Sequence, residues 1–166
     1  MKRFSAIIAL LLAICLLAGC SDALNKMVPP QEVTVEDLTI TLPGYFVNWS
    51  KETWAANFPF VYGFNSSAVL GVKESVSTLE ASLSEVSARK YADLFLEYNG
   101  LDSTVNEEDG LITFSYTADA EGTNITYLCG VYKGSTHFWV IQCYCATQEF
   151  EKFEEDFCQI LKSVRV

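Results

Sequence analysis

Apolar residues occupy both faces of two extended segments near the end of the chain, ITYLCGVY (125–132) and HFWVIQCYC (137–145). A strand with one face in water alternates apolar and polar residues, whereas a strand buried on both faces has a nearly continuous apolar run. The two segments flank Lys133-Gly134, a turn signal, and therefore predict neighbouring antiparallel strands. A sheet that contains them must be covered on both faces, which predicts helices on each side.

Turn residues divide much of the remaining chain into short β-rich segments. Asp109-Gly110 and Glu121-Gly122 are typical hairpin turns, and Asn65-Ser66-Ser67 has turn chemistry as well. Pro43-Gly44 closes the first segment. The expected strands are 33–42, 45–49, 60–64, 68–73, 103–107, 111–118, 124–132 and 136–146.

Two further segments show apolar residues at helical intervals. A helix is expected over 83–99, because Ser82 and Glu85 have capping-box spacing and Asn99-Gly100 is a suitable C-cap. A closing helix is expected over 148–162, with an apolar face formed by Phe150, Phe153, Phe157 and Ile160. The expected fold class is therefore α+β, an antiparallel sheet of about six strands flanked by helices on both faces.

The N-terminal segment predicts export. Lys2 and Arg3 precede an unbroken apolar run of thirteen residues, 6–18, which is shorter than the about 20 residues that a membrane span needs. The run ends in Leu17-Ala18-Gly19-Cys20, which resembles the lipobox of bacterial lipoproteins. The resemblance implies cleavage after a signal peptide at 1–19 and a diacyl lipid on Cys20. The alternatives are an ordinary secreted protein and a short core helix that happens to end in cysteine.

The chain that follows Cys20 divides into a tether and a domain. Residues 20–35 contain Pro29-Pro30 and little periodicity, which predicts a tether, and 36–166 is expected to form a single domain.

Acidic residues dominate the charge of the mature chain. Without Lys2 and Arg3 it keeps nine of the 11 basic residues against 21 acidic ones, a formal charge of −12. Nucleic-acid binding needs a cationic face, and docking on anionic lipid needs clusters of Lys or Arg. The charge therefore disfavours nucleic acid as a partner and leaves the lipid as the expected attachment to the membrane.

Several short motifs are similar to the PsbP-like or Mog1-like family, whose antiparallel sheet lies between helices. The first strand ends in Pro43 and is followed by the aromatic pair Tyr45-Phe46, although the family usually has tryptophan there. A hairpin strand has the sequence Val69-Leu70-Gly71-Val72, a Ser-Leu helix start lies at Ser82-Leu83, and the Phe-rich last helix runs into Ser163-Val164. The resemblance covers about 36–166. It implies a binding or accessory role and carries over no active-site residues, since many members are non-catalytic proteins attached to larger assemblies.

Aromatic residues crowd the loop-rich stretch 49–62. Trp49, Trp54 and Tyr62 are the candidate ligand-binding residues, because such rings can line a pocket for an apolar or sugar-like ligand. Alternatively, they cap the core beside the hairpin. A deep pocket lined by the three would favour a small ligand, and a flat exposed patch would favour a protein partner.

The single histidine gives little support to catalysis. His137 begins an apolar strand and is expected at the rim of a hairpin, without a plausible serine or thiolate partner for a triad. Gly-rich phosphate loops and HExxH are absent. We assign no catalytic residue, no metal ligand and no cofactor.

Four cysteines follow Cys20: Cys129, Cys143, Cys145 and Cys158. Cys143 and Cys145 share one face of a strand and could supply half of a metal or thiol redox site, but structural zinc sites usually have C-x₂₋₄-C spacing. With a hairpin that turns about Gly134, Cys129 lies opposite residue 139 or 140, too far from Cys143 for a disulfide. We expect four free thiols packed as small apolar groups.

These patterns predict a bacterial lipoprotein anchored to the cell membrane and facing outside the cytoplasm. Its expected role is non-enzymatic, as a binding or accessory protein for a protein partner or a small ligand. Two alternatives stay open: a thiol- or metal-binding protein that uses Cys143 and Cys145, and an uncharacterised hydrolase.

Overall fold

The computed structural model describes residues 28–75 and 85–166. The expected signal peptide, Cys20 and the expected helix start at Ser82 lie outside these ranges.

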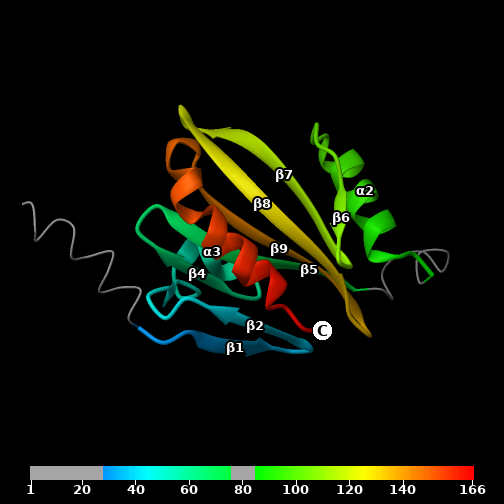
Figure 1. Ribbon diagram of the computed structural model, residues 1–166, viewed down its shortest axis with the longest axis horizontal. Coiled ribbons are helices and arrows are strands. Elements are labelled where there is room, and N and C mark those ends of the chain that lie inside the picture. Colours follow the sequence, from blue (N-terminus) through cyan, green and yellow to red (C-terminus); the bar gives the residue numbers. More distant parts are fainter. Residues whose placement is uncertain (1–27, 76–84) are drawn as a thin grey trace, which may run out of the picture.

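A seven-stranded antiparallel sheet forms the centre of the domain (Figure 1), in the order β3-β4-β5-β9-β8-β7-β6. A separate two-stranded sheet consists of β1 (Gln31–Val35) and β2 (Leu38–Leu42). The strands of the large sheet are β3 (Val47–Asn48), β4 (Val61–Phe64), β5 (Ser67–Ser75), β6 (Asn106–Glu108), β7 (Leu111–Ala120), β8 (Thr123–Lys133) and β9 (His137–Ala146).

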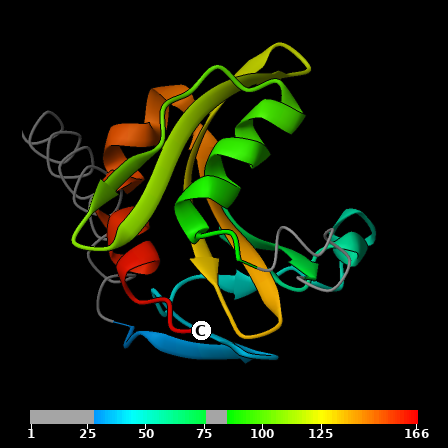
Figure 2. The same ribbon diagram turned by 90° about the vertical axis from the view of Figure 1, so that its right-hand side faces the viewer.

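Strand β9 lies in the middle of the large sheet and is buried on both faces. Phe138 and Val140 belong to the core under helix α2 (Ala88–Asn99), whereas Trp139 and Ile141 belong to the core under helix α3 (Phe150–Lys162). Figure 2 shows the two helices on opposite sides of the sheet. The expected α+β sheet with helices on both faces is confirmed, with seven strands instead of about six.

Helix α2 is bounded by two caps. The Ser87 hydroxyl accepts a hydrogen bond from the Lys90 N–H at 3.2 Å, so the helix begins at Ala88 and not at the expected residue 83. Gly100 adopts a left-handed conformation with φ of 62°, and its N–H donates to Glu97 and Leu96. The expected C-cap is confirmed, because glycine adopts this conformation without a steric penalty.

Residues 31–42 form a hairpin, which corrects two expectations. The segment 33–42 is not one strand, and residues 31–35 belong to β1 and not to the tether expected over 20–35. The turn consists of Glu36 and Asp37, with Glu36 at a φ of 54°. Asp is common in turns but Glu is not, and Glu-Asp lacks the glycine or asparagine that marks a two-residue hairpin turn, so the pattern did not predict this turn. The β2 residues Leu38, Ile40 and Leu42 are fully buried under α3.

The hairpin of β8 and β9 has a different register from the expected one. Lys133 pairs with Phe138 and Cys129 pairs with Gln142, so the turn comprises residues 134–136 and is not centred on Gly134. Gly134 does not have a positive φ. A Cβ atom there would lie 2.7 Å from a carboxylate oxygen of Asp37, so the glycine provides room for Asp37.

The four described cysteines are free thiols. Cys129 faces α2, whereas Cys143 and Cys145 both face α3, which confirms that the last two share one face of their strand. Although Cys143 is adjacent in the register to the partner of Cys129, the two thiols lie on opposite faces of the sheet. The two thiols are therefore kept apart because they point to opposite faces of the sheet, and not because they are distant along the strands.

We predict that Phe157→Ala lowers the free energy of unfolding by about 3–5 kcal/mol, measured by chemical denaturation. Phe157 is fully buried on α3, and its ring stacks on Phe153 with 5.9 Å between the centroids. Glu154→Ala, an exposed change on the same helix, serves as the control and should leave the denaturation midpoint nearly unchanged. Equal midpoints for the two variants would contradict this account of the core.

We predict that iodoacetamide modifies Cys158 first in the native protein, and all four thiols only after denaturation. Burial raises the pKa of every one of them, and Cys158 alone is partly exposed. A raised pKa keeps the thiol protonated at neutral pH, and the protonated form is a poor nucleophile. Mass spectrometry of unreduced protein gives the readout, and a peptide with an intramolecular Cys–Cys link would contradict the prediction.

Candidate functional site

An open pocket of about 880 Å³ lies between α2 and the second half of β5. Its lining is mainly apolar and includes Val72 of β5 together with Tyr91, Leu94 and Tyr98 of α2. Lys73 and Glu74 of β5 add charged groups. Pockets of roughly 300–1,000 Å³ with apolar walls and a few polar groups are typical of binding sites.

Tyr91 fixes one wall of this pocket. Its ring stacks on Phe138 with 4.3 Å between centroids and an interplanar angle of 5°, and its hydroxyl donates to Oε2 of Glu74 at 2.7 Å. Burial, followed by the hydrogen bond to Glu74, raises the pKa of Tyr91, so the phenol stays protonated and remains a donor. The stack and the hydrogen bond hold α2 against both β9 and β5.

The rim of the pocket presents an exposed aromatic side chain. Tyr98 lies on the last turn of α2 and is 93% exposed. Neighbouring Asn99 donates from its side-chain amide to the backbone oxygen of Phe95 at 2.8 Å, which stabilises this turn. A tyrosine offers a large apolar ring and one polar group, a combination that is enriched at interfaces.

The three aromatic residues selected from the sequence do not line one pocket. Trp49 and Trp54 meet edge to face with 6.5 Å between their centroids, and Trp49 covers Gly63, where a Cβ atom would lie 2.2 Å from the indole ring. Tyr62 packs against the core on the α3 side of the sheet. Alternation along β4 causes this separation, since Val61 packs on the α2 side and Tyr62 on the other.

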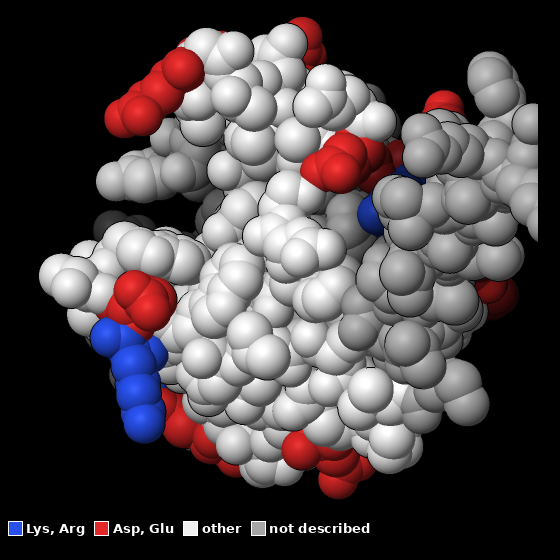
Figure 3. Space-filling view, turned by 90° about the vertical axis from the view of Figure 1, so that its left-hand side faces the viewer, with Lys and Arg blue, Asp and Glu red and all other residues white. Residues whose placement is uncertain are grey.

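The tryptophans instead form part of a small exposed patch at the edge of the sheet. Trp54 lies in the 3₁₀ helix η1 (Thr53–Asn57) and is 49% exposed, and Val47 of the edge strand β3 is 56% exposed. Figure 3, which views the molecule from the left of Figure 1, shows a mostly uncharged face with acidic side chains near its margins. Few basic side chains are visible there.

The cysteine pair is placed where it is chemically inert. Cys143 and Cys145 are buried under α3, and burial raises the pKa of Cys145 to about 11, with Glu149 contributing. Burial raises the pKa of Cys143 as well. Within 28–75 and 85–166, no group of three possible metal ligands includes a cysteine. The geometry thus gives no support to the thiol or metal alternative built on this pair.

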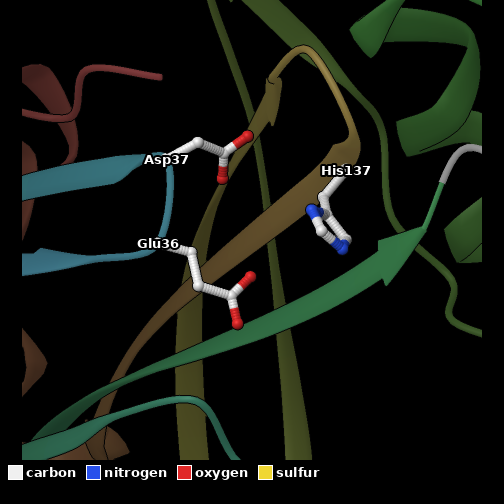
Figure 4. A group of neighbouring side chains, drawn as sticks. All are labelled: Glu36, Asp37 and His137. Carbon is white, nitrogen blue, oxygen red and sulfur yellow. The ribbon is translucent and has the colours of Figure 1, made fainter.

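His137 lies at the start of β9, as the sequence indicated, and has neighbours that the sequence did not indicate. Its imidazole lies beside the carboxylates of Glu36 and Asp37 in the β1–β2 turn (Figure 4). These residues are about a hundred positions away along the chain, so no local motif could reveal the cluster. Asp37 accepts hydrogen bonds from Thr136 and Trp139 and has none to His137, so the three do not form a hydroxyl–imidazole–carboxylate triad.

Comparison with solved structures relates the whole domain to known folds. No family model matches the chain, and no curated protein matches it by sequence. Cyanobacterial PsbP (CyanoP) of Synechocystis sp. PCC 6803 is 10% identical with a TM-score of 0.55. The match covers 84% of this chain and 94% of that one. A Mog1 mutant protein is 12% identical with a TM-score of 0.50, with coverage of 83% and 96%.

A Bacteroides thetaiotaomicron protein is 8% identical with a TM-score of 0.54. The match covers 82% of this chain and 47% of the length of that protein. At these identities the similarity concerns the fold and transfers no residue role. The described domain has the PsbP/Mog1-like fold.

Proposed function

We propose that this chain is a non-enzymatic binding protein, attached to the outer side of the cell membrane by a lipid on Cys20, and that its domain holds a partner protein beside α2. The open apolar pocket between α2 and β5 carries the proposal. A pocket of this size with an aromatic rim can take an apolar side chain or a short segment of a partner.

The surroundings of the pocket favour a protein partner over a small ligand. Val72 packs against the core under α2 and also against the cluster that contains Trp49, so the pocket and the tryptophans share one face of the sheet. Tyr98 of α2 and Trp54 of η1 are both exposed, and both of these elements pack on this face. Exposed Tyr and Trp residues often supply much of the binding energy of protein interfaces.

The lipid attachment is proposed from the sequence, and the start of the hairpin limits how far the domain would reach from the anchor. No helix in the described part of the chain is long and apolar enough to cross a membrane. Two acyl chains give stable anchoring, at ~0.8 kcal/mol per buried CH₂. Because β1 begins at Gln31, eleven residues after Cys20, even a fully extended connection spans at most about 40 Å. The domain would therefore stay near the membrane surface.

We predict that Cys20→Ala abolishes membrane attachment or leaves an unprocessed precursor, because the thiol is the proposed acylation site. Fractionation of cells followed by mass spectrometry of the N-terminus gives the readout. Cys158→Ala provides a matched control and should stay attached. Processed Cys20→Ala protein in the membrane fraction would contradict the lipoprotein proposal.

We predict that a photo-crosslinking residue at position 98 captures a specific protein in native membranes, whereas the same residue at Val166 captures far less. Val166 is also an exposed apolar position, so it controls for non-specific capture. Tyr98→Ala and Trp54→Ala should each weaken binding of the captured protein by about tenfold or more, because both rings are expected at the interface. Equal capture at both positions, or unchanged affinity of both variants, would contradict a partner site on this face.

A further inference from the structure

The turn between β1 and β2 meets the start of β9 in a cluster of three metal-binding side chains. One carboxylate oxygen each from Glu36 and Asp37 and one ring nitrogen of His137 all lie within 4.8 Å of one another. Figure 4 shows the two carboxylates and the imidazole facing a common space. Within the described ranges, this is the only group of three or more possible ligands.

Residues outside the cluster hold two of its members in place. Nε1–H of Trp139, a fully buried side chain, donates to Oδ1 of Asp37 at 3.0 Å. The Thr136 hydroxyl lies 2.8 Å from Nδ1 of His137 and 3.4 Å from Oδ2 of Asp37. Gly134 leaves room for the carboxylate of Asp37. Hydrogen bonds that orient ligands in this way are a general feature of metal sites.

A cation already occupies one side of the cluster. The ammonium of Lys73 forms an ion pair with Glu36 and lies 6.0 Å from the centre of the Trp139 ring. Its side chain is 32% exposed, and that of Glu36 is 47% exposed, so both can move into solvent. A stronger cation could therefore replace the ammonium without disturbing the core.

We propose that Glu36, Asp37 and His137 bind a divalent transition-metal ion, with zinc as the best fit. An imidazole suits zinc better than calcium or magnesium, which prefer oxygen ligands alone. Ligand atoms around a zinc ion at 2.0–2.2 Å are about 3.5 Å apart, so the cluster needs to contract by only about an ångström. Three protein ligands leave at least one coordination position for water.

The ion fastens the small sheet to the large one. Two of its ligands belong to the β1–β2 turn and the third belongs to β9 in the centre of the seven-stranded sheet. A metal ion that binds only the folded state stabilises that state by an amount that rises with the logarithm of the ratio of free ion to Kd. This inference does not rest on the partner site beside α2, and its test uses no partner.

Calorimetric titration of the detergent-solubilised full chain with Zn²⁺ tests the site, with Co²⁺ absorption to report the ligand type. We expect one ion per chain with micromolar affinity and no detectable binding of Mg²⁺ at the same concentration. His137→Asn and Asp37→Asn should each weaken Zn²⁺ binding about tenfold or more. The amide oxygen of Asn can still accept the hydrogen bond from Trp139, so the second variant preserves the fold.

Lys73→Met tests whether the ammonium of Lys73 competes with the metal ion for Glu36. Removal of this competing charge should raise the affinity for Zn²⁺, whereas a substitution that merely destabilised the fold would not. Glu32→Gln is the matched control: it removes an exposed charge on β1, where Glu32 pairs with Arg165, and should leave the affinity unchanged. Zn²⁺ should raise the unfolding temperature of the natural chain and not that of His137→Asn. Equal weakening by Glu32→Gln and His137→Asn, or an intense sulfur-to-cobalt charge-transfer band, would overturn the proposal.

Discussion

Strand β9 cannot be exposed to water on either face, and the rest of the domain is arranged around this requirement. Phe138 and Val140 point to one side and Trp139 and Ile141 to the other, and all four are buried. The neighbouring strands β5 and β8, which are of similar length, satisfy its backbone hydrogen bonds along both edges. Each face then needs a separate apolar cover, and α2 and α3 supply it from segments before and after the last hairpin.

The largest fully buried side chain creates a second requirement, because the indole N–H of Trp139 needs a hydrogen-bond acceptor. Asp37 supplies it from the β1–β2 turn at 3.0 Å. This bond, together with the burial of Leu38, Ile40 and Leu42 under α3, positions the small sheet. The close approach of Asp37 also explains why residue 134 has no side chain. The position of Asp37 also brings Glu36 beside Lys73 and His137. The need of the buried indole N–H for an acceptor thus helps to bring the three residues of the proposed metal site together.

Local signals predicted the elements that depend on local chemistry. Asp109-Gly110 and Glu121-Gly122 turn with positive φ at both residues, and Gly100 ends α2, as the sequence indicated. The hairpin at Glu36 gave no such signal, and the register at Gly134 was mispredicted because that glycine serves a contact and not a turn. The site beside α2 and the cluster at His137 each combine segments that are distant in the sequence. Neither could be found without the fold.

The two faces of the large sheet differ in how completely they are covered. On one face α3 lies beside the β1–β2 sheet, whereas the described residues on the other face provide only α2 and the short η1. Strands are spaced by about 4.8 Å and a helix is about 10 Å wide, so one helix covers about two strands. Helix α2 packs mainly on β7 and β8 and reaches β9 and β5 through Tyr91, so among the described residues the side toward β5 is the less covered one. The pocket therefore lies where the described elements leave part of an apolar face uncovered, and burial of that apolar surface by a partner would be favourable.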